Sequence, residues 1–193
     1  MIIINVSVII LYYYKQLVPD TLIWIYWWQS VIIGFFNFLL ILNTKQIIPG
    51  SIVVNGSPID NSKQSRRFSA LFFLFHYNFF HLAYLVFLVV ITTHQPGAAK
   101  LIKTSIGLFF LSSLFGYFQT RKESNQYQTD LGRLFFIPYV RIIPMHCAVL
   151  LPAFFHLSRF DIFIVLKFIA DIGMYLLINY SGKKKLAVTE PID

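Results

Sequence analysis

Residues 68–92 read FSALFFLFHYNFFHLAYLVFLVVIT and contain no Asp, Glu, Lys or Arg. As an α-helix rising about 1.5 Å per residue, this stretch is roughly 37 Å long, enough to cross a hydrocarbon core of about 30 Å. Its middle nevertheless carries His76, Asn78 and His81. Because polar groups at the centre of a lipid-spanning helix are costly without partners, we expect other helices to face these side chains.

The composition excludes an ordinary soluble domain. The mean hydropathy is +0.67 and only 12% of the residues are charged, whereas soluble proteins contain about 25% charged residues. A chain of 193 residues is predicted to form one domain. The net charge of +8 lies in short loops between apolar runs, which indicates membrane topology rather than nucleic-acid binding. A single cysteine, Cys147, excludes an internal disulfide.

The apolar runs predict an all-α integral membrane bundle in which residues 1–193 form a single transmembrane domain. The first run is interpreted as a helix rather than a signal peptide, because it has no basic lead-in and no small-residue cleavage site. Two polar segments, 43–67 and 119–133, are predicted to be loops. The six predicted spans cover about residues 1–17, 21–42, 68–92, 101–118, 134–156 and 162–180.

Six spans divide the basic residues unequally between the two sides of the membrane. The richer side is predicted to be cytoplasmic, which places both termini in the cytoplasm. That side holds Lys45, Lys63, Arg66, Arg67, Arg121, Lys122, Arg133, Lys183, Lys184 and Lys185. The other side holds Lys15, Lys100, Lys103 and Arg159.

Polar residues inside the predicted spans fall at matching depths when each helix is given an ideal rise. One tier near the middle contains Gln29, His81, His146 and Asp171, and a second tier contains Asn37, His76 and Arg141. Lys167 lies nearer the outer side. We therefore predict a polar pocket whose candidate ligand-binding residues are Gln29, Asn37, His76, His81, Arg141, His146, Lys167 and Asp171.

Each of these features also has a structural interpretation. Lys167 and Asp171 are four residues apart and could neutralise each other, and Arg141 could extend toward the cytoplasmic interface. His81 and His146 could each make one hydrogen bond between helices. Three prolines in the fifth span, at positions 138, 144 and 152, predict freed carbonyls that neighbouring side chains or water must satisfy.

Several functional hypotheses remain open for such a pocket. It could bind or transport a small anionic molecule, a lipid head group or protons, or it could be the polar core of an accessory or scaffold protein. A metal-dependent intramembrane hydrolase could use His81, His146 and Asp171 as zinc ligands. His76 lies about 140° around the helix from His81, so both cannot easily face one ion.

Two further classes have weaker signals. A b-type haem could be held between His81 and His146, but neither zinc nor haem is required by the sequence. No HExxH motif is present. For a serine hydrolase, the candidate serines are Ser105, Ser112 and Ser113, and none has the expected Gly-x-Ser context.

Four motifs occur in order along the chain: YWWQSVIIGFFN (26–37), FFLFHYNFFH (72–81), RIIPMH (141–146) and LKFIAD (166–171). Together they resemble an uncharacterised family of bacterial membrane proteins, Domain of Unknown Function 6498. The resemblance implies a multi-pass protein of the bacterial cytoplasmic (inner) membrane and implies no activity. In that family an acidic residue is common at the position of Gln29, and a glycine is common at the position of Asn78. This chain therefore lacks the carboxylate at position 29 that could act as a base or a metal ligand.

The partner expected for this chain is therefore the lipid bilayer rather than nucleic acid. Ser30 and Gly34 lie four residues apart in the second predicted span, a small-xxx-small step that permits close approach of another helix. Copies of the chain could associate through helix 21–42 in this way.

Overall fold

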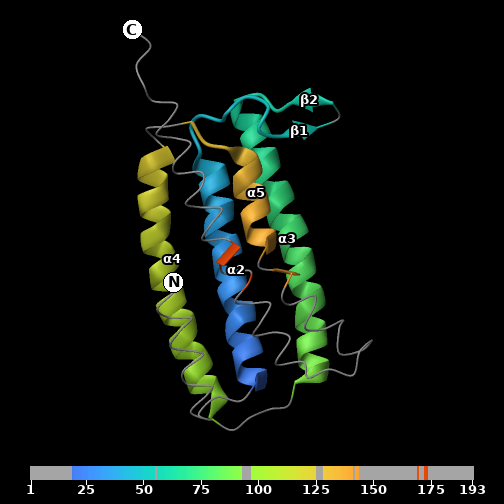
Figure 1. Ribbon diagram of the computed structural model, residues 1–193, viewed down its shortest axis with the longest axis vertical. Coiled ribbons are helices and arrows are strands. Elements are labelled where there is room, and N and C mark those ends of the chain that lie inside the picture. Colours follow the sequence, from blue (N-terminus) through green and yellow to red (C-terminus); the bar gives the residue numbers. More distant parts are fainter. Residues whose placement is uncertain are drawn as a thin grey trace. The chain divides into compact units, whose positions relative to one another are not determined.

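The computed structural model describes residues 19–54, 56–92, 97–124, 128–140, 142–143, 169 and 172–173. The chain divides into two compact units, residues 1–139 and 140–193, and the elements below belong to the first apart from the last residue of α5. The described elements are α-helices apart from one small hairpin, which confirms the predicted all-α class (Figure 1). Its elements are α2 (Pro19–Asn43), β1 (Val53–Val54), β2 (Ser57–Pro58), α3 (Lys63–Ile91), α4 (Ala98–Ser124) and α5 (Leu131–Val140).

Helix α2 is the centre of this arrangement, with α3 packed on one side and α4 on another (Figure 1). Side-chain hydrogen bonds fix the register of α2 against α3. The indole Nε1 of Trp24 donates to Thr92 Oγ1 over 3.0 Å, and Trp27 Nε1 donates to the carbonyl oxygen of His81 over 3.1 Å. Residues early in α2 therefore meet residues late in α3, as in an antiparallel pair.

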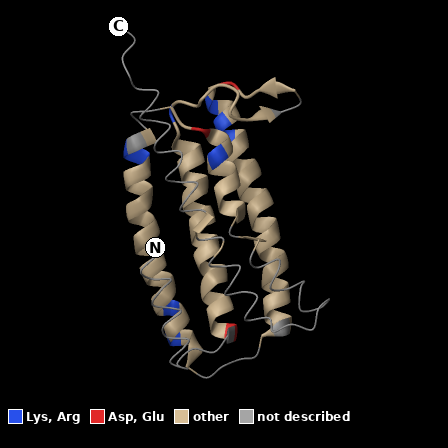
Figure 2. Ribbon diagram, viewed as in Figure 1, with Lys and Arg blue, Asp and Glu red and all other residues tan. Residues whose placement is uncertain are grey.

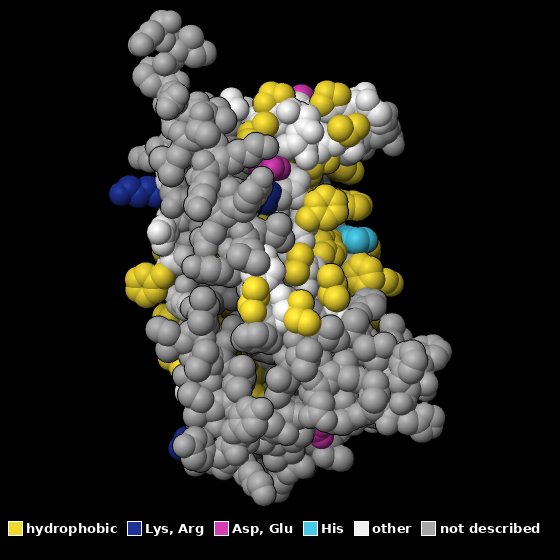
Figure 3. All heavy atoms as spheres, viewed as in Figure 1, with side chains coloured by type: hydrophobic (Ala, Val, Ile, Leu, Met, Phe, Trp, Pro, Cys, Tyr) yellow, Lys and Arg dark blue, Asp and Glu magenta, His cyan; other side chains and the backbone are white. Residues whose placement is uncertain are grey.

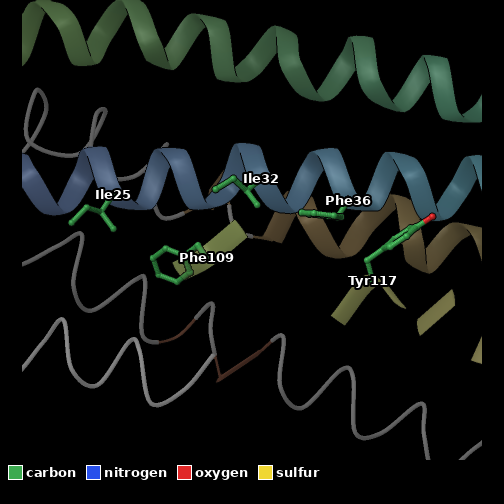
Figure 4. Close-up of a cluster of buried hydrophobic side chains, with 5 residues drawn as sticks. All are labelled: Ile25, Ile32, Phe36, Phe109 and Tyr117. Atoms are coloured by element: carbon green, nitrogen blue, oxygen red, sulfur yellow. The ribbon is translucent and has the colours of Figure 1, made fainter. Parts of the chain in front are cut away.

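Apolar side chains join α2 to α4. Ile25, Ile32 and Phe36 follow one another at steps of seven and four residues, so they share one face of α2. They are buried against Phe109 and Tyr117 of α4 (Figure 4). The Phe36 and Tyr117 ring centroids lie 5.8 Å apart, within the distance range of favourable aromatic pairs. This cluster, unlike the contact with α3, contains no polar group except the Tyr117 hydroxyl.

Three of the helices are long and apolar enough to cross a membrane: Asp20–Asn43, Lys63–Val90 and Ala98–Lys122. Large apolar side chains cover their outward faces, with Phe75 80% and Phe115 75% exposed, and Figure 3 shows such side chains gathered on one face of the molecule. The described Lys and Arg residues occur toward the helix ends and in the adjoining loop (Figure 2). The predicted first span and nearly all of the sixth lie outside the described residues, as does most of the fifth.

The helices extend further than the apolar runs that predict them. Helix α3 begins at Lys63 rather than near Phe68, because the Ser62 hydroxyl accepts from the Ser65 backbone N–H and caps the new end. Helix α4 continues to Ser124. The predicted loops 43–67 and 119–133 are therefore too long, because α3 includes residues from 63 onward and α4 includes residues up to 124. Polar residues outside the hydrocarbon core can remain helical.

The remaining loop residues are ordered by backbone contacts with the segment before α5. Ile48 N donates to Thr129 O over 3.0 Å, and Thr129 N donates to Gln46 O over 2.9 Å. Gly132 allows the start of α5 to lie close to the loop at Ser51, since a Cβ at Gly132 would lie 2.4 Å from the Ser51 carbonyl oxygen. Helix α5 is thus anchored at its start by the loop that leaves α2.

Removing the cap of α3 is expected to destabilise the protein modestly. Ser62→Ala deletes the acceptor for Ser65 N–H, and loss of such a cap typically costs about 1 kcal/mol.

Asp60 accepts hydrogen bonds from the Ser65 and Ser62 hydroxyls, which lower the pKa of its carboxyl group. Its contribution is present above the unfolded-state pKa and is lost as the pH falls through the folded-state value. Thermal unfolding in detergent measures this dependence. Acidification should lower the unfolding temperature of Asp60→Asn less than that of the wild type, and an equal decrease in both would contradict a role for the Asp60 carboxylate.

Candidate functional site

A closed hydrogen-bond network lies between α2 and α3, near the middle of both helices. Ser30 Oγ lies 3.0 Å from His81 Nε2 and 2.8 Å from Tyr77 Oη. The Tyr77 hydroxyl also lies 3.1 Å from the Ser30 carbonyl oxygen, so its single proton is shared between this oxygen and Ser30 Oγ. All three side chains are buried. They form a buried polar contact between α2 and α3, in addition to the hydrogen bonds of Trp24 and Trp27.

The backbone fixes where the proton of His81 resides. His81 Nδ1 lies 2.9 Å from the carbonyl oxygen of Tyr77, one turn earlier in α3. A carbonyl can only accept, so Nδ1 carries the proton and donates to it. In the neutral ring Nε2 is then an acceptor, and the Ser30 hydroxyl donates to it. Both ring nitrogens of His81 are therefore occupied by protein groups.

Small residues on α2 allow this contact to form. Ser30 and Gly34 lie one turn apart on the face toward α3, and the Tyr77 ring packs directly against Gly34. A Cβ at Gly34 would lie 2.2 Å from Tyr77 Cε1, a distance that no side chain tolerates. The small-xxx-small step thus serves an approach within the chain. Association of copies through α2 stays a prediction.

Gln29 lies at the same height as Ser30 but on another side of α2. It is 2% exposed, and its amide nitrogen has no hydrogen-bond partner in the part of the chain that the structure describes. Successive helical residues are separated by about 100°. Gln29 therefore points away from α3, into the sector between the apolar face toward α4 and the side of Asn37. A buried donor without a partner costs about 1–3 kcal/mol.

Asn37 satisfies a carbonyl that a proline leaves free. Pro138, inside α5, has no N–H and cannot donate to the carbonyl of Leu134, four residues earlier. Asn37 Nδ2 donates to that oxygen instead. The sequence-based expectation that a neighbouring side chain would satisfy a freed carbonyl is confirmed at this proline. The contact gives Asn37 a structural role at the α2–α5 junction.

His76 lies on a different face of α3 from His81. Its side chain is exposed, and Nδ1 lies 2.6 Å from the hydroxyl oxygen of Tyr139 in α5. The Phe72 ring stacks on the imidazole at 5.5 Å between centroids and 11° between planes. His76 is thus held among aromatic rings and is not directed at the network around Ser30.

The other predicted pocket residues are Arg141, His146, Lys167 and Asp171, and they lie outside the described residues. Their meeting with Gln29 and His81 stays a prediction. Within the described ranges, no group of three or more His, Cys, Asp or Glu side chains could hold a metal ion. For His81 to bind zinc or haem, the metal would have to displace the Ser30 hydroxyl from Nε2 or the Tyr77 carbonyl from Nδ1.

Ser30 and Tyr77 are the site residues that the sequence reasoning missed. The serines considered as nucleophile candidates were Ser105, Ser112 and Ser113, and the structure instead pairs Ser30 with a histidine. The signal was present in the small step at Ser30 and Gly34, which marks the face where another helix comes close. A serine on such a face, at the depth of a histidine on the neighbouring span, is the pattern to search for.

These features define the class: an α-helical chain with three helices able to cross a membrane and a buried polar network between two of them. The model of the family of unknown function DUF6498 matches residues 1–187. The chain belongs to this family. Comparisons with curated proteins and with solved structures found no match.

Proposed function

We propose that the chain is a multi-pass protein of the bacterial cytoplasmic membrane whose polar core binds a small anionic molecule or a lipid head group. In this proposal six helices cross the bilayer and both termini are cytoplasmic. The three long apolar helices support membrane residence. The buried amide nitrogen of Gln29, which has no hydrogen-bond partner among the described residues, carries the binding proposal.

The charge distribution supports the proposed orientation. Loop 44–62 and residues 128–130 meet at one end of the first unit, where they connect the ends of α2, α3, α4 and α5. Only Lys100 and Lys103, among the described basic residues, belong to the opposite end (Figure 2). A cytoplasmic location of the richer end follows the positive-inside rule. The residues at the richer end are Lys45, Lys63, Arg66, Arg67, Arg121, Lys122 and Arg133.

Labelling of single cysteines tests this orientation. Lys45 and Lys100 are both exposed and lie at opposite ends, so they form a matched pair. In a Cys147→Ser background, a membrane-impermeant maleimide applied to intact cells should label Lys100→Cys and leave Lys45→Cys unlabelled until the membrane is opened. The reverse pattern would contradict the proposed topology.

The chemistry of Gln29 determines the kind of ligand. Its NH₂ group is a donor without a partner in the described ranges, so a ligand that pairs with it must supply an acceptor. Phosphate and carboxylate oxygens are strong acceptors, and the predicted pocket residues Arg141 and Lys167 would add positive charge. An anion with such oxygens therefore fits this donor better than a cation does.

The substitution Gln29→Leu separates ligand binding from a structural role. Leucine removes the buried amide while keeping most of the volume. In extensively dialysed protein, Gln29→Leu should unfold at a higher temperature than the wild type, because an unpaired buried donor has been deleted. Added glycerol phosphate should stabilise the wild type, by about 2.7 kcal/mol at a hundred times its dissociation constant, and should not stabilise the variant.

The second candidate function is that of a scaffold whose polar core only fixes helix register. The closed network of Ser30, Tyr77 and His81 favours it, since each of these side chains has a partner. If Gln29→Leu lowers the unfolding temperature of the dialysed protein and glycerol phosphate stabilises neither form, the amide has a partner within the chain. The scaffold function would then replace the binding proposal.

A further inference from the structure

We propose that Ser30 is a nucleophile activated by His81 and that it cleaves a hydrophobic carboxylic ester dissolved in the membrane. This activity goes beyond the anion binding proposed for Gln29 and does not depend on it. It rests on the pairing of a serine hydroxyl with an oriented imidazole inside an apolar helix pair. Such a pairing is the central requirement of nucleophilic catalysis by serine.

The geometry matches the roles of nucleophile and base. Ser30 Oγ lies 3.0 Å from His81 Nε2, within the range for a proton transfer to a general base. The Tyr77 carbonyl, 2.9 Å from Nδ1, holds the imidazole in the tautomer whose Nε2 is free to accept. A third group that orients the base completes the arrangement that activated nucleophiles require.

The same contacts argue against a proton pathway through His81. A relay needs a titratable or rotating group on each side of the imidazole, so that protons can enter and leave. Nδ1 instead donates to a backbone carbonyl within its own helix. The proton on that nitrogen has no onward acceptor, whereas Nε2 can take a proton from Ser30 and return it to a leaving group.

Tyr77 completes the site as the group that would stabilise an oxyanion. Its hydroxyl oxygen lies 2.8 Å from Ser30 Oγ and donates to the Ser30 carbonyl in the free protein. When an ester carbonyl carbon occupies the position in front of Oγ, that hydroxyl is within reach of the carbonyl oxygen. Donation to this oxygen stabilises the negative charge that forms during attack.

The proposed reaction has two steps that balance. Ser30 Oγ attacks the carbonyl carbon and its proton passes to His81 Nε2; the C–O bond to the alcohol then breaks, and the alcohol leaves with that proton. Water, the second reactant, adds to the acyl-serine after giving a proton to Nε2. The carboxylic acid departs as Ser30 recovers its proton. Neither step oxidises or reduces any group.

The apolar surroundings determine the substrate class. Ser30 is 0% exposed, and its hydroxyl contacts Tyr77 and His81 between α2 and α3. Neither of the described side chains that contact the Ser30 hydroxyl carries a fixed charge, so a charged substrate would lose its hydration against them. An uncharged ester of low polarity enters from the lipid at little cost, by displacing the Tyr77 hydroxyl from its contact with Ser30.

A fluorophosphonate probe tests the nucleophile directly, since it phosphorylates activated serines. Purified wild-type protein in detergent should be labelled at Ser30, with the site read by peptide mass spectrometry. Ser30→Ala should abolish labelling, and His81→Gln should slow it by about 10²–10⁴-fold, the usual contribution of a general base. Ser69→Ala is the matched control, because Ser69 is also buried, at 3% exposure, and its hydroxyl has no hydrogen-bond partner among the residues that the structure describes. It should be labelled as the wild type is.

Turnover of a long-chain p-nitrophenyl ester gives the second readout. Wild type and Ser69→Ala should hydrolyse it at equal rates, and Tyr77→Phe should lower kcat more than it changes KM. If Ser30→Ala does not fold, Ser30→Cys in a Cys147→Ser background keeps the size and the nucleophile and should react with an apolar maleimide. A folded wild type that neither reacts with the fluorophosphonate at Ser30 nor hydrolyses the ester overturns the proposal.

Discussion

Gly34→Ala is expected to lower the unfolding temperature of the protein far more than the same substitution at a glycine of α4. The new Cβ would lie 2.2 Å from Cε1 and 2.6 Å from Cδ1 of the Tyr77 ring. Either the ring or a whole helix must move, and overpacking of this kind costs about 1–3 kcal/mol. Displacing Tyr77 also breaks its contacts with Ser30. Thermal unfolding in detergent, followed by tryptophan fluorescence, measures the loss.

The same substitution elsewhere supplies the control. At Gly107 and Gly116 in α4, an added Cβ would meet nothing within 4 Å. Alanine is a better helix former than glycine by roughly 1 kcal/mol, so Gly116→Ala should be neutral or stabilising. The double variant Gly34→Ala, Tyr77→Ala should be less damaged than the sum of its parts, because the ring that clashes is gone. Equal effects of Gly34→Ala and Gly116→Ala would contradict the close approach of α3 to α2.

The long apolar helices could be predicted from the sequence because their evidence is one-dimensional. A charge-free stretch such as 68–92 and its length decide whether a segment can span a membrane, and the helices α2, α3 and α4 lie where such stretches are. The positions at which the helices begin and end were harder to predict. Ser62 caps α3 six residues before the apolar run begins at Phe68, and this cap depends on a local hydrogen bond rather than on hydropathy.

The site was harder to predict, because the position of a side chain depends on its depth along the helix and also on the rotation of the helix about its axis. Residue rise places Gln29 and His81 at one height, but it does not say that they lie on different sides of α2. The histidine meets Ser30, the next residue in the chain, and the amide of Gln29 points elsewhere. The rotation of each helix is set by packing, here by the Tyr77 ring against Gly34. That contact could be suspected from the sequence but not assigned to a partner.

Asn37→Leu is expected to destabilise the wild-type protein by about 1–3 kcal/mol, the usual cost of a buried polar group without a partner. Leucine fills the space but cannot donate to the Leu134 carbonyl, which Pro138 already deprives of its helical N–H. The effect should depend on that proline. In a Pro138→Ala background the backbone N–H of residue 138 returns and can donate to Leu134 O, so the same Asn37→Leu substitution should cost well under 1 kcal/mol.

A double-mutant cycle on the free energy of unfolding in detergent measures this dependence. Effects that each substitution has independently of the other, such as a change of volume or of helix propensity, cancel in the cycle. The coupling energy then measures the interaction of the two positions through the Leu134 carbonyl. We expect a coupling of about 1 kcal/mol or more, in the direction that Pro138→Ala rescues Asn37→Leu. Costs that simply add, within about 0.5 kcal/mol, would show that Asn37 does not satisfy the carbonyl freed by the proline. Helix α5 would then be held mainly by its aromatic contacts with α3, such as that of Phe135 with Phe73.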